Sequence, residues 1–466
     1  MSHLLRTDLG GTARTGPGQC VLSLLLFSDV HVMDTVSPAR GEWVELLGNE
    51  PRWKPLLHMH RPYEAITHWA FAAHVEAARR KPLGPWSARP FDFALSLGDN
   101  IDNAQHNELE VFLTILSGGQ TRVSAHGGVH EASAALGSGP WPYWCPEPST
   151  DDLWKPRGYP AVAGYVARAS AELSSDGLGF SWAALPGNHD LMRQGTALPD
   201  ADIERIATGS HKTLQCPAGF DPADPLTLFV TEPAAFSCGT DRVIEALASR
   251  RAVDQQGWIE AVVARGALGY TAQHVASGCA DAVIDTGRVR IILLDTNHPA
   301  GDYQGSIGEA QLDWLEQRLA EVDAQSGRLA VLASHHGSAS LTNTRGPDAS
   351  RRHAAALTAV AHRHPCVVAW LVGHRHLHQI VPHPGPGGGF WEITTGSLID
   401  WPSQARAVEF VCHDDGSLEI VCTLLDHEAP PDSLAFLHRD LSRLFAGPQA
   451  ERMQGQAGDG NVRLRR

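Results

Sequence analysis

The residues of this 466-residue chain that could do chemistry are grouped in short polar motifs, each after a run of apolar residues. In the sequence DVH, a carboxylate at Asp29 and an imidazole at His31 lie two residues apart, on the same side of an extended segment. In GHRH, His374 and His376 repeat this spacing with two imidazoles. Each pair could bind one cation, although either motif alone is weak evidence for a metal site.

Three further motifs add ligand types that complement these pairs. Asp99 follows a glycine in GDNIDN, and its two carboxylate oxygens could bridge two metal ions. GNHD offers the side-chain carbonyl of Asn188 as a neutral ligand beside His189, and SHHG offers His335 or His336. Taken singly, such residues are as readily explained as caps and turns. Five of these motifs, each after its own apolar run, favour a metal centre.

The elements that must position these motifs are six short apolar runs rich in Val, Leu, Ile and Phe, which are typical of buried strands. Segments between the runs predict helices over residues 63–80, 309–322 and, from a weaker pattern, 351–362. Strands that alternate with helices indicate an α/β fold, in which sites form at the carboxyl ends of the strands. The six runs cover residues 21–27, 91–97, 180–185, 289–294, 329–333 and 366–372.

Two long stretches interrupt this pattern, at about residues 104–178 and 195–285. Insertions of this length usually carry function or fold as small caps, so we expect them to supply substrate contacts. The alternative is that Trp141, Trp144 and Trp154 simply give the first insertion a core of its own.

The remaining boundaries complete the expected domain organisation. A catalytic domain covers residues 19–426, and near its end the segment AVEFVCHDDGSLEIVCTLL predicts a β-hairpin. A helical segment over 427–448 and a tail over 449–466 follow, and the low apolar content of the tail predicts disorder.

Composition and charge exclude several classes of protein. The formal net charge of −15 argues against a nucleic-acid partner. No apolar run reaches the ~20 residues that span a bilayer, and the N-terminal stretch lacks the apolar region of a signal peptide. Because the eight cysteines are scattered and no secretion signal is evident, we expect a cytoplasmic protein. The expected partner is a small-molecule substrate, with no membrane or nucleic-acid partner. The sequence leaves its oligomeric state open.

In their order along the chain, the motifs D-x-H, G-D-x-x-D, G-N-H-D, H and G-H-x-H resemble the pattern of the calcineurin-like metallophosphoesterase superfamily. The resemblance implies a four-layer αββα sandwich with a two-metal centre between its sheets. It also implies a role for each motif position. Asp29, His31 and His376 would hold one metal, Asn188, His335 and His374 the other, and Asp99 would bridge both, while His189 would face the leaving group and Asp102 would orient His189.

Departures from known branches of this superfamily narrow the assignment. Asp102 stands where purple acid phosphatases carry a tyrosine ligand, so a purple iron centre is not expected. Asn103 stands where protein Ser/Thr phosphatases carry an arginine that clamps the phosphate. Asn103 and His336 are candidate substrate-binding residues. The two insertions also set the chain apart from the shorter cyclic-nucleotide phosphodiesterases.

The chemistry of such a site fits a hydrolase. Two divalent ions, of Mn, Fe or Zn, suit these nitrogen and oxygen ligands. A hydroxide that bridges the two ions would act as the nucleophile. His189 would assist the leaving group with a proton. We therefore expect an enzyme, a binuclear metallophosphoesterase that acts on a small organic phosphate ester. The alternatives are a phosphodiesterase of cyclic-nucleotide or glycerophosphodiester type and a non-catalytic scaffold of the same fold.

Overall fold

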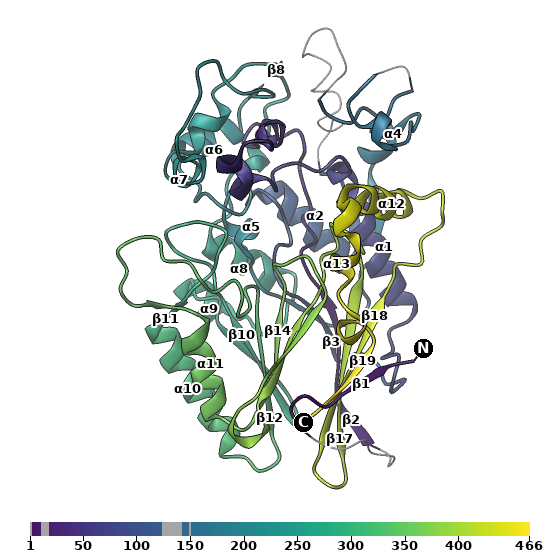
Figure 1. Ribbon diagram of the computed structural model, residues 1–466, viewed down its shortest axis with the longest axis vertical. Coiled ribbons are helices and arrows are strands. Elements are labelled where there is room, and N and C mark those ends of the chain that lie inside the picture. Colours follow the sequence, from purple (N-terminus) through teal and green to yellow (C-terminus); the bar gives the residue numbers. More distant parts are fainter. Residues whose placement is uncertain (1, 11–17, 124–141, 149–150) are drawn as a thin grey trace.

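All six apolar runs form strands, and two facing sheets share them equally (Figure 1). The computed structural model describes residues 2–10, 18–123, 142–148 and 151–466. In a seven-stranded sheet, β2 (Gly18–Phe27), β3 (Phe93–Ser96) and β6 (Trp182–Ala184) are parallel neighbours. In a six-stranded sheet, β10 (Val289–Leu294), β12 (Leu329–Ser334) and β14 (Val367–Val372) are parallel neighbours. The carboxyl ends of three motif-bearing strands therefore lie at one edge of the seven-stranded sheet, and those of two, β12 and β14, lie at one edge of the six-stranded sheet.

The other strands extend the two sheets. The seven-stranded sheet has the order β1-β19-β18-β17-β2-β3-β6, and the six-stranded sheet has the order β15-β16-β14-β12-β10-β9. The expected hairpin is present, because β17 and β18 pair in antiparallel fashion on either side of its turn. The added strands are β1 (Leu4–Arg6), β9 (Ala282–Thr286), β15 (Gln379–His383), β16 (Phe390–Thr394), β17 (Ala405–His413), β18 (Leu418–Leu425) and β19 (Val462–Arg465).

Helices cover the outer face of each sheet (Figure 1). α10 (Glu309–Asp323) and α11 (Ala354–Arg363) pack on the six-stranded sheet. α1 (Thr67–Arg80) covers the seven-stranded sheet, and α2 (His106–Ser117) and α12 (Leu434–Ala446) pack against α1. The helices expected over residues 63–80, 309–322 and 351–362 are thus present. The result is the expected four-layer αββα sandwich.

Each sheet packs against the other sheet on one face and against helices on the opposite face. This is possible because successive side chains of a strand point to opposite faces. In β10, Ile291 and Leu293 belong to a buried cluster with residues of both sheets. Their neighbours Ile292 and Leu294 instead belong to a cluster with Leu315 and other residues of α10 and α11. A continuous apolar run is therefore required of a strand that is covered on both faces.

The C-terminal tail is not disordered, contrary to the expectation from its composition. It contains α13 (Ala450–Gln454) and β19, and β19 pairs with both β1 and β18. Val462 and Leu464 are buried at alternate positions of β19. Two apolar residues with this spacing are enough to bury one face of a short strand, and a composition averaged over the whole tail hides them.

A segment before α1 also departs from the alternation of strands and helices, although its composition did not reveal this. Residues 33–66 contain η1 (Glu42–Leu47), η2 (Pro51–Leu56) and η3 (Glu64–Ile66). Trp43 packs with Phe236, which comes from the second insertion. This segment and part of the second insertion therefore fold together as a cap beyond the strand ends (Figure 1).

The insertions consist of short elements. In the first, Trp144 is buried and packs with Tyr159 and Tyr165, and Trp154 lies beside it, while Trp141 lies outside the described residues. The cluster also includes Tyr63 before α1 and Leu441 of α12, so these residues belong to a shared core and not to a core of the insertion alone. The first insertion contains α2, β4 (Gly119–Thr121), η4 (Lys155–Arg157), α4 (Tyr165–Ala169) and β5 (Leu173–Ser175). The second contains α6 (Ala201–Ala207), β7 (His211–Lys212), α7 (Pro225–Thr231), η5 (Pro233–Ser237), β8 (Arg242–Val243), η6 (Ala248–Arg250), α8 (Gln255–Ala264), α9 (Ala272–Ser277) and β9.

The insertion boundaries differ from the expected ones in one respect, because β9 is an edge strand of the six-stranded sheet rather than part of a cap. Within the described residues, no helix has both the length and the apolar character needed to cross a bilayer. The remaining short elements are α5 (Asn188–Leu191), β11 (Ile307–Gly308), β13 (Arg351–Arg352), η7 (Pro386–Gly388), η8 (Gly447–Gln449) and η9 (Ala457–Asp459).

Candidate metal centre

The seven predicted ligands come together where the strand ends of the two sheets meet. The seven-stranded sheet supplies four of them and the six-stranded sheet three. They are Asp29 and His31 after β2, Asp99 after β3, Asn188 after β6, His335 after β12, and His374 and His376 after β14. Ligand atoms of Asp29, His31, Asp99 and His376 all lie within 4.8 Å of one another, and those of His335, His336 and His374 lie within the same distance of one another.

The backbone at most of these positions is left-handed, which is uncommon for residues other than glycine. The φ angles are 50° at Asp29, 48° at His31, 52° at Asp99, 67° at His374 and 51° at His376. Such conformations persist only where the surrounding structure imposes them, and they cluster at functional sites.

Two glycines explain the spacing around the G-N-H-D motif. A Cβ atom at Gly187 would lie 2.2 Å from Oδ1 of Asp99, so only glycine allows the loop to approach that carboxylate. Gly195 has a φ of 66°, and a Cβ there would lie 2.2 Å from Cδ2 of His189. The chain therefore folds back tightly over the imidazole and holds it in place.

His31 has the protonation pattern of a metal ligand. Its Nδ1 lies 3.1 Å from Oδ1 of Asp102, a carboxylate that can only accept, so this nitrogen carries the proton. Burial, followed by the nearby charge of His189, lowers the pKa of His31 to about 4. The neutral ring therefore presents a lone pair at Nε2, a buried atom with no hydrogen-bond partner among the described residues, 3.7 Å from Oδ2 of Asp99.

Two further imidazoles are oriented in the same way. Nδ1 of His376 donates to Oδ2 of Asp400 at 2.5 Å, and its Nε2 lies 3.2 Å from Oδ1 of Asp29. Nδ1 of His335 donates to the carbonyl of Leu97 at 2.8 Å, and its Nε2 lies 3.1 Å from Oδ2 of Asp99. An outer acceptor that fixes one ring nitrogen while the other faces the site is the usual arrangement around metal-binding histidines. The residues present therefore fit divalent metal ions.

The side chains of the two candidate substrate-binding residues, His336 and Asn103, contact protein groups rather than the cavity. Nδ1 of His336 contacts Oγ1 of Thr296 at 2.9 Å, and its Nε2 contacts the carbonyl of Tyr303 at 3.1 Å. Asn103 donates from its backbone and from Nδ2 to Glu108, at 2.8 Å in each case. Both side chains are buried and are absent from the lining of the cavity described below.

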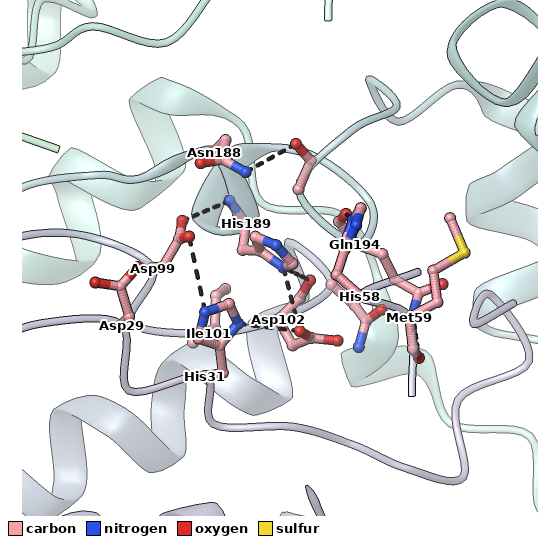
Figure 2. Close-up of polar contacts among 12 residues, drawn as sticks. Asp29, His31, His58, Met59, Asp99, Ile101, Asp102, Asn188, His189 and Gln194 are labelled. Carbon is pink, nitrogen blue, oxygen red and sulfur yellow. Dashed lines mark hydrogen bonds and ion pairs between the residues drawn. The ribbon is translucent and has the colours of Figure 1, made fainter. Parts of the chain in front are cut away.

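Asp102 lies between His189, the predicted proton donor, and the cluster of ligand residues. Nδ1 of His189 lies 3.0 Å from the carbonyl of Asp102 and 3.1 Å from its Oδ1. The other carboxylate oxygen of Asp102 accepts from Nη1 of Arg40 at 2.7 Å. Figure 2 shows His189 between Asp99 on one side and His58 on the other. Asp102 thus orients both His31 and His189, and Arg40 holds Asp102 in place.

The buried carboxylates draw positive charge toward the site. Burial alone would lower the pKa of His335 and of His376, but Asp99 and Asp29 outweigh it and raise these pKa values to about 9 and about 10. The pKa of His189 is raised for the same reason, because Asp99 and Asp102 outweigh the effect of burial. This electrostatic environment suits cations bound between the carboxylates.

A cavity of about 270 Å³ opens directly onto the cluster. Its lining includes ligand candidates from the two sheets together with His189. It is lined by His31, His58, Arg61, Asp99, Asn188, His189, Tyr303, His374 and His376. Within the described part of the chain, neither long insertion contributes to this lining, contrary to the expectation that they supply the substrate contacts.

The residues that sequence reasoning missed are Arg40, His58, Arg61, Tyr303 and Asp400. None of these residues belongs to a motif. Each lies in a connection whose sequence shows no regular helical or strand-like spacing, such as HMHRPYE for His58 and Arg61. Charged residues beside an aromatic residue in a loop can indicate a binding loop. This signal does not say which role each residue has.

Comparison with known proteins gives two partial matches among curated proteins, and no family model matches the chain. The manganese-dependent ADP-ribose/CDP-alcohol diphosphatase of Xenopus tropicalis is 29% identical over 123 residues, which are 24% of this chain and 33% of that protein. A probable cyclic nucleotide phosphodiesterase of Synechococcus sp. (strain WH7803) is 34% identical over 104 residues, which are 21% of this chain and 37% of that protein. The chain therefore spans about a third of the length of these relatives.

Two solved structures also align with most of the chain. A dimetal phosphatase from Danio rerio aligns over 88% of this chain and 97% of its own, with 12% identity and a TM-score of 0.42. A putative 5'-nucleotidase from Staphylococcus aureus aligns over 90% of this chain and 58% of its own, with 14% identity and a TM-score of 0.32. Both TM-scores lie below 0.5, so these two structures do not bear on the function. The ordered motifs, the αββα sandwich and the two curated relatives support a relationship to the calcineurin-like metallophosphoesterase superfamily.

Proposed function

We propose that this protein is a metal-dependent phosphoester hydrolase that acts on a small organic phosphate ester. The observation that carries the proposal is the cluster of carboxylate and imidazole ligand atoms at the strand ends of both sheets, with the amide oxygen of Asn188 beside His335 and His374. Divalent ions of Mn, Fe or Zn, when bound there, supply Lewis-acid stabilisation and a nucleophile near neutral pH. Asp29, His31 and His376 would hold one ion, Asn188, His335 and His374 the other, and Asp99 both.

His189 is the proposed proton donor to the leaving group. Its Nδ1 is held by Asp102, so Nε2 is the nitrogen left for the cavity that His189 lines. Asp99 and Asp102 raise the pKa of His189, which favours the protonated ring, and a protonated ring could donate its proton to a departing alkoxide. Asp102 and Arg40 keep the imidazole in this orientation.

The ester is a monoester or a diester. The names of the two relatives, a diphosphatase and a phosphodiesterase, support testing the diester first. A scaffold that retains the fold without turnover is the second candidate. The imidazole of His189, oriented by two acceptors and facing a cavity, is a feature that a scaffold does not require.

The test compares hydrolysis of bis-p-nitrophenyl phosphate and p-nitrophenyl phosphate by the full-length protein loaded with Mn²⁺. His189→Ala is expected to reduce turnover by about 10²- to 10⁴-fold, the contribution typical of a positioned acid. His211→Ala, which removes an exposed histidine in the second insertion, is the matched control and should retain full activity.

Each outcome distinguishes between the candidates. Faster cleavage of the diester would support a phosphodiesterase, and faster cleavage of the monoester would indicate a phosphatase. Equal rates for wild type, His189→Ala and metal-free protein on both esters would contradict the proposed hydrolase and favour the scaffold.

A further inference from the structure

The cavity contains a cationic side chain that belongs to none of the metallophosphoesterase motifs. Arg61 lies between η2 and η3 and lines the cavity together with the ligand candidates Asp99 and His376. It is 7% exposed, and among the described residues it is the one Arg or Lys in that lining. The site thus combines a fixed positive charge with the predicted metal ligands.

Arg61 is held firmly in this position. Its Nε and Nη2 donate to the two oxygens of Asp400, at 2.7 and 3.1 Å, and its Nη1 donates to the carbonyl of His58 at 3.2 Å. Burial alone would lower the pKa of Arg61, but Asp400 outweighs burial and raises it above its ordinary value. A charged group ordered in advance loses little freedom when it binds a ligand.

These contacts leave two hydrogens of the guanidinium unused. Each terminal nitrogen carries two hydrogens, and in the described part of the chain Nη1 and Nη2 each contact one acceptor. The planar fork of an arginine matches the spacing of two oxygens on one phosphorus. Since Arg61 lines the cavity, its free N–H groups can meet a phosphoryl group there.

We propose that Arg61 binds the non-reacting oxygens of the substrate's phosphoryl group and is the phosphate-recognition residue of this site. The proposal rests on the proposed function and deepens it. It gives the site the phosphate clamp that is missing at Asn103, but from a different segment of the chain. The same residue also contacts Asp400, the outer partner of His376, so a purely structural role is the competing explanation.

Tyr63 provides the control that separates the two roles. Its hydroxyl donates to Asp400 at 2.5 Å, yet its fully buried ring is absent from the cavity lining. Tyr63→Phe therefore weakens the support of Asp400 and His376 without changing the cavity wall. Arg61→Gln removes both the support and the free N–H groups, and Arg61→Lys keeps the charge but loses the fork.

The experiment uses full-length protein loaded with Mn²⁺ and measures three quantities for each variant. They are bound manganese by atomic absorption, the Kd of inorganic phosphate by calorimetry, and kcat and KM for bis-p-nitrophenyl phosphate. For Arg61→Gln we expect the Kd of phosphate and the KM to rise by about 10- to 100-fold, as for loss of a charge-assisted hydrogen bond. The Kd and KM of Arg61→Lys should lie between those of wild type and Arg61→Gln, and Tyr63→Phe should bind phosphate like wild type. All three variants should retain their manganese content.

Other results would overturn the inference. If Arg61→Gln and Tyr63→Phe lose manganese or kcat alike while phosphate affinity stays at the wild-type level, Arg61 acts only through Asp400. Unchanged phosphate binding in Arg61→Gln, or a wild-type protein that binds no phosphate, would also refute it. If wild type binds phosphate in an Arg61-dependent way but cleaves no ester, the hydrolase proposal fails and this inference stands.

Discussion

His335 and His336 are adjacent in sequence but their rings are engaged by different parts of the site. Nε2 of His335 is 3.1 Å from the amide oxygen of Asn188, a predicted ligand. Both ring nitrogens of His336 contact oxygens outside the ligand set, those of Thr296 and Tyr303. The geometry thus favours His335 as the ligand, a choice that the sequence left open.

This difference predicts unequal effects of two alanine substitutions on metal content. His335→Ala should lower the manganese content by about one ion per chain, because it removes a nitrogen ligand while both ring nitrogens of His336 are engaged by Thr296 and Tyr303. His336→Ala serves as the control and should retain the wild-type content, measured by atomic absorption after dialysis. Loss of manganese from His336→Ala alone would reverse the assignment.

At the scale of single elements, β19 is a strand that forms within the tail expected to be disordered. It lies between β1 and β18 in the seven-stranded sheet, and its carbonyl at Arg465 accepts from Nε1 of Trp391. Its pairing joins the two ends of the chain within one sheet, because β1 and β19 are parallel neighbours. The tail is therefore part of the fold that supports the site.

A buried leucine in β19 tests this contribution. Leu464→Ala should lower the free energy of unfolding by about 2–5 kcal/mol, the range for a leucine removed from a core. Leu444→Ala is the matched control, since the same substitution on α12 removes a side chain that is 44% exposed and should cost far less. Both values come from urea denaturation followed by circular dichroism. Equal stability of the two variants would mean that the tail contributes nothing.

The elements that could be predicted are those whose sequence pattern depends on local geometry alone. A strand covered on both faces needs a continuous apolar run, so β2, β10 and β14 are evident in the sequence itself. The motifs could be recognised because ligands and glycines recur at fixed spacing. Arg61 and Asp400 could not be paired in advance, because they are far apart in sequence and only the tertiary fold brings them together.

At the scale of the whole molecule, the candidate centre joins the two sheets. Asp29 and Asp99 follow strands of one sheet, and His335 and His376 follow strands of the other. Ions held between these residues would link the two halves of the sandwich. A ligand that binds the folded chain but not the unfolded chain raises the free energy of unfolding in proportion to the logarithm of the ligand concentration.

Metal addition should therefore raise the melting temperature of the whole protein. At a free Mn²⁺ concentration of about 100 times Kd, the expected stabilisation is about 2.7 kcal/mol for one site. Excess EDTA should reverse the shift in a scan followed by circular dichroism. Asp99→Asn, which alters the proposed shared ligand, should show a much smaller response. A wild-type melting temperature that is indifferent to both Mn²⁺ and EDTA would contradict the proposed centre.

The left-handed backbone at the ligand positions also bears on how this sequence can evolve. Non-glycine residues in that conformation typically cost about 1–3 kcal/mol each, so the apoprotein bears a conformational penalty at Asp29, His31 and Asp99 before any ion arrives. Glycine would remove that penalty and the ligand together. A lineage released from selection for the site would gain stability by drifting to glycine at these positions. If Asp and His instead persist at these positions, purifying selection acts on metal binding rather than on folding.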